Sequence, residues 1–487
     1  MRARLPAWLG GFLLGLLYFG VLHALEPRLA DYDGYFHVRY ASLGPDEWLG
    51  REFRWMPFGV FAGGRWVDHQ WLFHALIWPF TLVLPLLAAA KASATVFAAA
   101  MLGAFAWLLA DRGVARPVLW SLALLGASRF FDDRMLMPRT QALSLALLFV
   151  GIGMAFRAVE DRRWERALLL LGVLFAWTYH VSVMLVPCAL VAGLAGGEGR
   201  GFSLANVRPA VFAAVGVFLG FLAHPQSPDT FTFFWLHAVE KVVNPTGQAV
   251  GAEWMPVDTR TWLVHVAPVV ALGAWGVWGM RRANADTRAL ALLAAGWLLA
   301  SAGAVKWLEY GVPFAMAALA LLFRDNVRAT GVLWLGAPLA VLNGAAVLDH
   351  VRTTLPPSDR LAGIATKLPA DDCAVFHADW TDFSELVFWA PQCSYVVGLD
   401  PHFLSAGDPK RAALVEAALA GRVARLGDMA DAAFGAGWVV ATSEPMLTRA
   451  AADPRLEEVH RDAAGALFRV RAPGAGGTPP ATPPALP

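Results

Sequence analysis

Two acidic clusters in this sequence contain residue types that can do chemistry. In the first, Asp31 and Asp33 are separated by one residue, and His37 and Arg39 follow closely. Two aspartates at this spacing can ligate a divalent cation through oxygen, or one of them can act as a general base. Gly34 permits a sharp backbone turn that would aim Asp33 inward. The alternative is a solvated polar linker, because aspartate and glycine are common in loops.

The second cluster is the stretch 129–134, Arg-Phe-Phe-Asp-Asp-Arg. Its charges lie at a predicted membrane boundary, where unpaired ionisable groups are costly and usually functional. With the first cluster it predicts one shared cation and phosphate site, in which Asp33, Asp132 and Asp133 could hold Mg²⁺ or Mn²⁺. A metal-free site, with arginine and lysine supplying the positive charge, is equally open. The alternative to both is a structural salt-bridge network.

Two further segments carry polar groups on the same predicted side. Lys306 and Glu309 lie in a short turn between two apolar runs. Lys306 can bind a lipid phosphate, or it can merely extend its ammonium group to the membrane surface. The loop 224–261 is long and polar and includes Glu253. Loops of this length are often lids or binding loops.

The elements that position these residues are predicted to be membrane helices. Of the 487 residues, 57% are hydrophobic and only 16% are charged, whereas soluble domains carry about a quarter charged residues. Apolar runs of about 16 to 20 residues are long enough to cross a hydrocarbon core of about 30 Å. The net charge of +1 gives no reason to expect a nucleic-acid partner. About eleven spans are predicted, near 6–25, 92–110, 117–129, 139–157, 167–179, 181–196, 209–223, 262–280, 288–304, 311–323 and 329–348.

Basic residues set the predicted orientation. Every short loop assigned to the inner side contains arginine, which predicts a cytoplasmic N-terminus and an external C-terminal part. The segment 74–90 is apolar enough to span, but Pro79 and Pro85 interrupt it. We predict an interfacial or re-entrant helix there, since a further span would reverse every later loop. The transmembrane domain is then 1–349.

That domain has predicted outer loops at 26–91, 129–139 and 224–261. The residues 350–471 alternate short β-rich runs with helical stretches, which predicts a small external α/β domain with a partly parallel sheet. The predicted strands are Cys373–His377, Ser394–Gly398, Trp438–Thr442 and Ala466–Val470. Cys373 and Cys393 each begin a run, and either a disulfide or two buried thiols is open. The tail 472–487 is rich in Pro, Gly, Ala and Thr and is predicted to be disordered.

These residues, in this order, resemble the GT-C superfamily of membrane glycosyltransferases. Tyr32–Tyr35 resembles the acidic first-loop motif of the bacterial oligosaccharyltransferase catalytic subunit, and 111–139 is similar to that family's second acidic loop region. Trp177–Ser182 falls where the family has an aromatic outer turn, and Lys306–Pro313 resembles the turn whose basic residue contacts a lipid-linked phosphate. The segment 67–74 looks more like uncharacterised bacterial proteins of this type.

The resemblance implies roles for individual residues. Asp33 would be the first-loop catalytic acid, Asp132 or Asp133 the second-loop acid, and Lys306 a ligand of the lipid phosphate. His74 would belong to the interfacial helix, as in the protein mannosyltransferase and aminoarabinose transferase branches. The candidate substrate-binding residues are Asp31, Tyr35, His37, Arg39, Arg134, Arg139, His180, Lys306 and Glu309. The acceptor-peptide motif WWDYG of oligosaccharyltransferases is absent from the sequence, so protein N-glycosylation is not expected.

The implied activity is transfer of a sugar from a polyprenyl-phosphate donor to a glycan, lipid or protein acceptor. The reaction would be a single inverting displacement at the periplasmic face of a bacterial inner membrane, and the lipid bilayer would be a partner. The alternative is a non-catalytic or transport-type membrane protein, such as a lipid-linked glycan polymerase, a flippase or an assembly factor. A transporter should show internal repeats and charged helices at the midplane, and the sequence shows neither.

Overall fold

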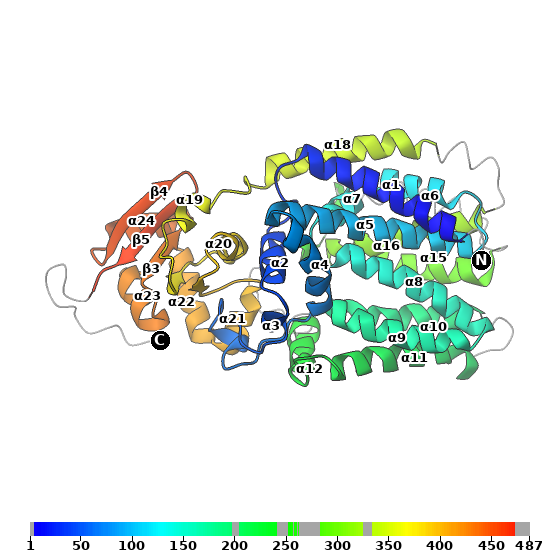
Figure 1. The fold of residues 1–487 in the computed structure, drawn as a ribbon, viewed down its shortest axis with the longest axis horizontal. Coiled ribbons are helices and arrows are strands. Elements are labelled where there is room, and N and C mark those ends of the chain that lie inside the picture. The colour runs from blue at the N-terminus through cyan, green and yellow to red at the C-terminus, as the bar shows by residue number, and fades with distance from the viewer. Residues whose placement is uncertain are drawn as a thin grey trace. The chain divides into compact units, whose positions relative to one another are not determined.

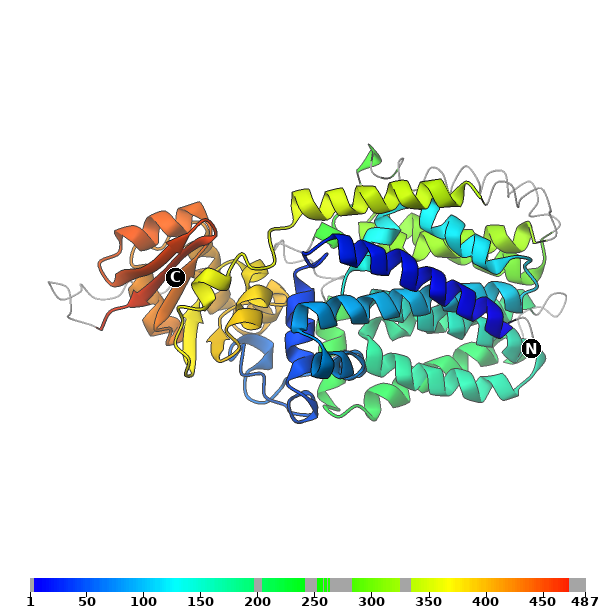
Figure 2. The ribbon, with the colours of Figure 1, turned by 45° about the horizontal axis from the view of Figure 1, so that its top comes forward.

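The computed structural model divides the chain into two compact units (Figures 1 and 2). The first unit holds residues 1–49 and 68–356, and the second holds 50–67 and 357–487. The structure describes residues 4–196, 204–240, 252–256, 258–260, 262, 283–324 and 334–472. Residues 263–280 of one predicted span and 473–487 of the predicted tail therefore lie outside the described residues.

The first unit is built of α-helices, which run roughly side by side in both views (Figures 1 and 2). They are α1 (Arg4–Leu25), α2 (Asp33–Ser42), α3 (Pro45–Trp48), α4 (Trp71–Val83), α5 (Leu86–Asp111), α6 (Pro117–Ala127), α7 (Arg129–Leu136), α8 (Gln141–Glu160), α9 (Arg163–Thr178), α10 (Leu185–Gly196), α11 (Leu204–Leu222), α12 (Asp229–Phe234), α15 (Ala285–Ala300), α16 (Leu308–Leu322) and α18 (Gly336–Thr354). Short helical turns connect some of them: η2 (His180–Met184), η3 (Trp235–Glu240), η4 (Ala252–Trp254) and η6 (Val305–Trp307).

Several of these helices suit a membrane. Within the described part of the chain, α1, α5, α8 and the segment Val305–Leu322 are the four long and apolar enough to cross one, and α4, α6 and two further segments are shorter apolar helices. The predicted spans in the described ranges coincide with helices, although their ends differ by several residues. The total of about eleven spans stays a prediction.

Helix α1 presents two different faces. Leu9, Leu13 and Leu17 recur every fourth residue, so they share one face, and their side chains are 46%, 53% and 67% exposed. Such an apolar stripe suits contact with lipid. On another face, a Cβ atom at Gly15 would lie 2.5 Å from the Cα of Ala99 in α5. Glycine thus lets the two backbones approach, as small residues do between membrane helices.

The segment 74–90 was predicted to be one interfacial or re-entrant helix, but in the structure it belongs to two helices. Helix α4 ends at Val83, Leu84 is extended, and α5 begins at Leu86. The break follows from Pro85, because the residue before proline is disfavoured in the helical region. Residues 86–90 therefore belong to the long helix α5.

A buried carboxylate joins the ends of several helices. Asp111 at the end of α5 has a fully buried side chain and pairs with Arg4 at 2.7 Å, Arg112 at 2.6 Å and Arg157. Arg112 also contacts Asp286 of α15 at 3.2 Å. Arg112 and Arg157 are among the arginines that the topology prediction used, and here they fasten helix ends together.

The second unit contains a five-stranded mixed sheet (Figure 2). Its strands are β1 (Cys373–Phe376), β2 (Cys393–Tyr395), β3 (Trp438–Ala441), β4 (Leu456–Asp462) and β5 (Gly465–Val470), and their order is β2-β1-β3-β5-β4. Strand β1 is parallel to β2 and β3, whereas β5 is antiparallel to β3 and β4. The four predicted strands and the partly parallel sheet are confirmed, and β4 was missed.

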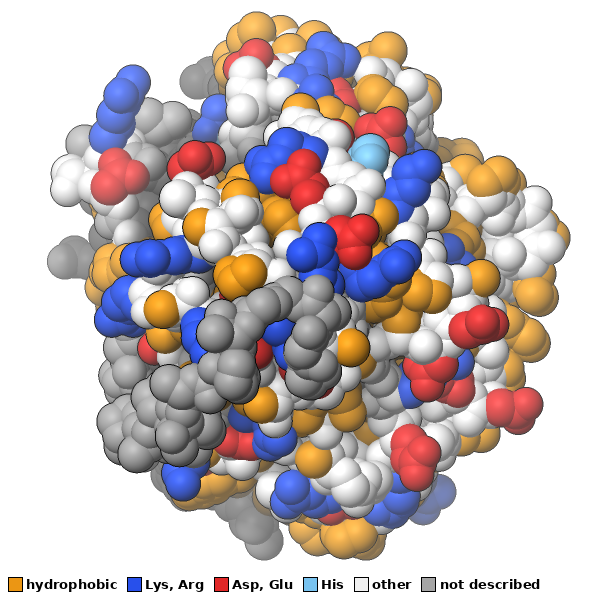
Figure 3. All heavy atoms as spheres, turned by 90° about the vertical axis from the view of Figure 1, so that its left-hand side faces the viewer, with side chains coloured by type: hydrophobic (Ala, Val, Ile, Leu, Met, Phe, Trp, Pro, Cys, Tyr) orange, Lys and Arg blue, Asp and Glu red, His pale blue; other side chains and the backbone are white. Residues whose placement is uncertain are grey.

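Helices accompany this sheet. They are α19 (Ala362–Ala365), α20 (Phe383–Trp389), α21 (Pro401–Gly407), α22 (Pro409–Leu419), α23 (Leu426–Phe434) and α24 (Glu444–Ala452), with the short turn η7 (Trp380–Asp382) before α20. Side chains such as Phe376, Leu426 and Val439 form the apolar core. On the face drawn in Figure 3, basic and acidic side chains are interspersed, which is typical of a surface in contact with water.

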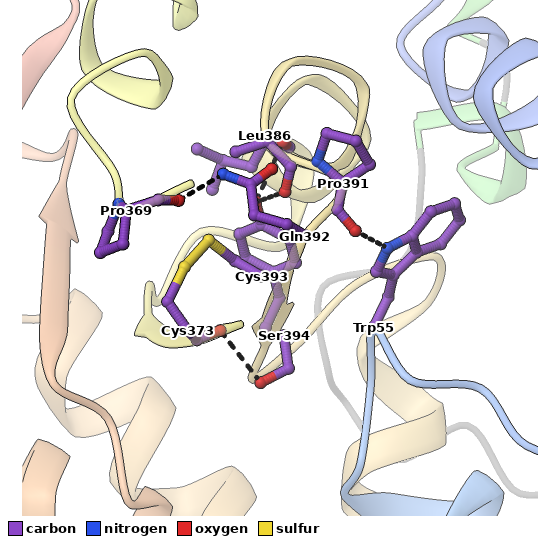
Figure 4. Close-up of a disulfide and its surroundings, with 10 residues drawn as sticks. Trp55, Pro369, Cys373, Leu386, Pro391, Gln392, Cys393 and Ser394 are labelled. Atoms are coloured by element: carbon purple, nitrogen blue, oxygen red, sulfur yellow. Dashed lines mark hydrogen bonds between the residues drawn. A yellow bond between two sulfur atoms is a disulfide. The ribbon is translucent and has the colours of Figure 1, made fainter. Parts of the chain in front are cut away.

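Cys373 and Cys393 form a disulfide (Figure 4). They are direct partners in the parallel register of β1 and β2, with Cα atoms 4.4 Å apart. Of the two alternatives that the sequence left open, the structure has the bridge. It closes a segment of 20 residues that contains η7 and α20, and so it ties the edge strand to its neighbour.

Residues 50–67 are an excursion of the first outer loop into the second unit. The backbone N–H of Tyr395 donates to the carbonyl of Trp55 at 2.7 Å. The Trp55 indole donates to the carbonyl of Pro391 at 2.7 Å (Figure 4). The turn η1 (Gly59–Phe61) lies against α21, where the Phe61 and Phe403 rings are 4.9 Å apart. The excursion lies inside the predicted loop 26–91, yet it groups with the C-terminal unit.

Candidate active site

The first acidic cluster lies at the start of helix α2. Asp33 is the first residue of α2, where a carboxylate interacts favourably with the helix dipole. Gly34 is helical rather than a sharp turn, which corrects the expectation for this residue. A Cβ atom at Gly34 would collide with the ring of Pro138, so glycine here allows the first turn of α2 to approach the segment before α8.

Arg139 fastens this cluster to the segment that follows α7. Its guanidinium binds both carboxylate oxygens of Asp31, and it contacts Asp33 at 2.8 Å and Glu253 at 3.2 Å. Planar two-pronged contacts of this kind are strong and orient both partners. The Asp31 side chain is 7% exposed, whereas that of Asp33 is 26% exposed. Asp33 is therefore the more accessible of the two aspartates.

Glu253 joins Arg139 to a second arginine. Arg134 of α7 contacts Glu253 at 2.8 Å and Glu309 of α16 at 2.8 Å. Burial of Glu253 opposes ionisation, but the nearby cations Arg134 and Arg139 outweigh it and hold the pKa of its carboxyl well below the usual range. Lys306 contributes in the same direction. The site thus combines four carboxylates with two arginines and a lysine.

Lys306 lies in the turn η6 beside two indole rings. Its ammonium nitrogen is 2.8 Å from the centroid of the Trp254 ring and 5.1 Å from that of Trp307. Cation–π contacts of this kind hold an ammonium group without neutralising its charge. Lys306 and Glu309 are therefore brought into the same network as the two arginines.

The second acidic pair is placed differently from its prediction. Asp132 is fully buried and accepts a hydrogen bond from the Tyr18 hydroxyl of α1 at 2.8 Å. Asp133 lies 4.0 Å from the His350 imidazole, with 14% of its side chain exposed. Burial raises the pKa of both carboxyls. At Asp133 the charges of His350, Arg134 and Arg129 oppose this shift, and the charge of Asp31 adds to it.

The three carboxylates predicted to hold Mg²⁺ or Mn²⁺ contact other side chains in the structure. Asp33 contacts Arg139, Asp132 binds Tyr18, and Asp133 faces His350. Among the residues that the structure describes, no three histidine, cysteine, aspartate or glutamate side chains are arranged to hold a metal ion. Metal binding by Asp33, Asp132 and Asp133 stays a prediction.

Two other candidates lie in a histidine-rich region. The Nδ1 atom of His37 is 2.9 Å from Nε2 of His74, and Nδ1 of His74 is 2.8 Å from the Asp68 carboxylate. His180 begins η2, and its ring lies 4.4 Å from that of His237. The resemblance assigned His74 only to the interfacial helix and gave Asp68 no role.

The remaining candidates, Tyr35 and Arg39, lie on α2 with His37. Tyr35 is buried, and burial lowers the pKa of Arg39. The sequence did not single out Glu253 as a site residue. Its only signal was an acidic residue in a long loop on the same predicted side as the arginines.

Comparison with known proteins gives a fold but no close relative. No family model matches the sequence, and no curated protein does. Solved structures do match: ArnT from Cupriavidus metallidurans bound to undecaprenyl phosphate has a TM-score of 0.62 at 13% identity, covering 97% of this chain and 99% of that one. Archaeal oligosaccharyltransferase AglB from Archaeoglobus fulgidus, in complex with an inhibitory peptide and a dolichol-phosphate, has a TM-score of 0.58 at 14% identity, covering 89% and 69%.

A third similar structure is the arabinofuranosyltransferase AftD from Mycobacteria. It has a TM-score of 0.55 at 15% identity, with 96% of this chain and 40% of that chain covered. The three similar proteins are all GT-C glycosyltransferases. Together with the apolar helices and the small C-terminal sheet, these matches show that the chain has a GT-C-like membrane fold.

Proposed function

We propose that this protein is a membrane glycosyltransferase that moves a sugar from a polyprenyl-phosphate donor to an acceptor. The observation that carries the proposal is the arginine-anchored acidic loop, in which Arg139 holds Asp31 and leaves Asp33 partly exposed. The similar structures include proteins bound to undecaprenyl phosphate and to a dolichol-phosphate, which supports a lipid-linked donor.

Asp33 is the general base of the proposed reaction. It takes the proton from the acceptor hydroxyl or amine while the acceptor atom bonds to the anomeric carbon. The bond from that carbon to the phosphate oxygen breaks, and the phosphate leaves with the electron pair. One displacement inverts the anomeric centre. Asp31 is less suited to the role, because Arg139 covers both of its oxygens.

The departing phosphate needs positive charge. Lys306, Arg134 and Arg139 gather around Glu253, and fixed cations of this kind stabilise charge that develops in a transition state. We assign the charge stabilisation to these side chains, because all three act on the same carboxylate, Glu253. The proposed location is the periplasmic face of a bacterial inner membrane, with the N-terminus inside.

The test is transfer by purified protein in lipid, with labelled polyprenyl-phosphate sugars and a bacterial envelope extract as the acceptor source. We expect Asp33→Asn, which keeps the size and removes the charge, to lower the transfer rate by about 100-fold or more. Asp161→Asn is the control, because Asp161 forms an exposed ion pair with Arg163. Treatment with EDTA should leave the wild-type rate unchanged.

Full activity of a folded Asp33→Asn variant would refute the assigned base. Loss of wild-type activity in EDTA, restored by Mg²⁺ or Mn²⁺, would refute the metal-free assignment. Binding of a lipid-linked sugar without transfer to any fraction of the extract would favour the alternative, a lipid-linked glycan polymerase, a flippase or an assembly factor.

A further inference from the structure

Three buried polar side chains form a continuous chain between helix α2 and the start of helix α4. Asp68, His74 and His37 are 1%, 1% and 7% exposed. The Asp68 carboxylate is 2.8 Å from Nδ1 of His74, and Nε2 of His74 is 2.9 Å from Nδ1 of His37. The chain thus passes through both nitrogens of one imidazole and ends on a second imidazole.

The local fold fixes Asp68 at the buried end of this chain. Asp68 precedes α4, and its Oδ1 accepts the backbone N–H of Gln70 at 3.1 Å. Its Oδ2 is left to face His74, in the first turn of α4. One carboxylate oxygen therefore fixes the turn while the other orients an imidazole, as carboxylates behind functional histidines do.

These contacts determine which nitrogen carries each proton. With Asp68 ionised, His74 donates through Nδ1–H, and its Nε2 is then an acceptor. His37 must in turn donate through Nδ1–H, so its Nε2 carries a lone pair. The outer end of the chain is therefore a proton acceptor rather than a donor.

His37 is placed where such an acceptor can serve the proposed reaction. It lies four residues after Asp33 in α2, so the two side chains share one face of the helix. Burial lowers the pKa of His37 well below its usual value, and the charges of His74 and Arg139 lower it further. His37 is thus neutral between turnovers, and its ring holds an added proton poorly.

Aromatic side chains enclose the chain. The rings of Tyr40 and Phe36 lie 4.9 Å and 6.1 Å from that of His74, and the Phe73 ring lies 5.4 Å from that of His37. In such an apolar enclosure a buried charge is costly unless it is paired. Asp68 supplies that pairing at His74, the imidazole farther from Asp33 along the chain.

We propose that the chain His37–His74–Asp68 is a proton path that clears from Asp33 the proton taken from the acceptor. The inference rests on the proposed function, and it assigns a role to His37, His74 and Asp68, which take no part in the proposed displacement. Asp33 hands its proton to Nε2 of His37, directly or through one water. His37 passes its Nδ1 proton to Nε2 of His74, and the resulting imidazolium is held by Asp68.

The path moves the proton away from the ion pair between Asp33 and Arg139. The Asp33 carboxyl lies 2.8 Å from the Arg139 guanidinium, and a proton on Asp33 would remove one of the ion-pair partners of Arg139. A proton kept on His37 would face the same guanidinium, whereas a proton on His74 faces a carboxylate. After the product leaves, the reverse steps restore the starting tautomers and return the proton to Asp33, whose partly exposed carboxyl releases it to solvent.

Asp68→Asn is the sharpest perturbation, because it keeps the shape and reverses the hydrogen bonding. The asparagine amide would donate to Nδ1 of His74, which forces Nε2–H on His74 and then Nε2–H on His37. A related tautomer reversal is known to cripple serine proteases that keep their geometry. We expect kcat to fall by about 100-fold with KM unchanged.

Two measurements separate a proton path from a merely structural network. In histidine-labelled protein, nitrogen NMR should show Nδ1–H tautomers for His37 and His74 in the wild type and Nε2–H tautomers in Asp68→Asn. Added imidazole should restore transfer by His37→Ala, since a small base can replace the missing ring. Imidazole should leave Asp33→Asn unchanged. The pH dependence of kcat should be interpreted together with the other groups that face the chain, which are His69, Arg139 and His224.

The outcomes are distinct for the two proposals. Wild-type kcat in a folded Asp68→Asn variant, or no rescue of His37→Ala by imidazole, overturns the proton path while transfer itself stands. Unchanged tautomers in Asp68→Asn overturn it without any activity measurement. If the wild type transfers no sugar at all, the proposed function fails, and the tautomers then report only a structural hydrogen-bond chain.

Discussion

Replacing Arg139 by glutamine tests whether this arginine anchors the first acidic loop. The substitution leaves Asp31 without the guanidinium that binds both of its oxygens. Removing one partner of a buried ion pair costs about 3–5 kcal/mol, because the other charge stays buried and uncompensated. Asp33 is more exposed than Asp31, and Glu253 keeps its contact with Arg134 at 2.8 Å, so both should contribute less to the loss than Asp31.

We therefore expect Arg139→Gln to lower the free energy of unfolding by about 3–5 kcal/mol. Urea unfolding in detergent, followed by tryptophan fluorescence, measures the change. Arg163→Gln is the matched control, because Arg163 is 89% exposed and pairs with Asp161 at 2.7 Å. Its cost should be much smaller, because an exposed ion pair contributes little to stability.

A second substitution checks the cause of the loss. Adding Asp31→Asn to Arg139→Gln removes the uncompensated charge, so the double variant should be more stable than Arg139→Gln alone. If Arg139→Gln costs no more than Arg163→Gln, or if Asp31→Asn gives no recovery, Arg139 is not the anchor of the loop.

Two further predictions concern the C-terminal unit. Serine at both Cys373 and Cys393 should lower the free energy of unfolding of this unit by about 3 kcal/mol, because the bridge joins residues 20 positions apart. A reductant should cause the same loss in the wild type. Cys188→Ala, which removes a cysteine outside the bridge, should not lower the stability of this unit. Burial lowers the pKa of His377 below 6.5. The contribution of the neutral His377 to the free energy of unfolding is therefore full above pH 6.5. It falls as the pH drops toward the lowered pKa of the folded state, by at most about 1.4 kcal/mol per pH unit. Urea unfolding at several pH values should show a smaller slope for His377→Gln, and an equal slope would contradict the assignment.

Features governed by local pattern were predictable from the sequence. Apolar runs predicted the helices because the bilayer demands a minimum apolar length. Short β-rich runs predicted four of the five strands; β4 was missed because its sequence, Leu-Glu-Glu-Val-His-Arg-Asp, is mostly charged. An edge strand with charged residues is common, since charge discourages further pairing.

Features governed by partners far along the chain were not predictable. Arg139 and Glu253 are 114 residues apart, as are Tyr18 and Asp132. Neither pair has a local signature, because an ion pair or a buried hydrogen bond depends only on where the fold brings the two groups. The adjacent aspartates of the second cluster were therefore predicted to act together, although Asp132 faces α1 and Asp133 faces α18.

Gly34 shows how one residue type permits two explanations. Glycine in an acidic loop predicted a sharp turn, which is its commonest use. The structure uses its missing side chain instead, since Pro138 occupies the space that a Cβ atom would need. The sequence could not distinguish these uses, because the neighbour that requires glycine is about a hundred residues away in the chain.

The excursion 50–67 has a consequence for protein engineering. Because of it, the main chain passes between the two units at 49–50, 67–68 and 356–357. Truncation after residue 356 would remove the partners of Trp55 and Phe61 and leave these aromatic rings uncovered, which favours aggregation. The C-terminal unit is thus not a cassette that can be cut off or exchanged at one boundary. A chimera between homologues would have to transplant 50–67 together with 357–487.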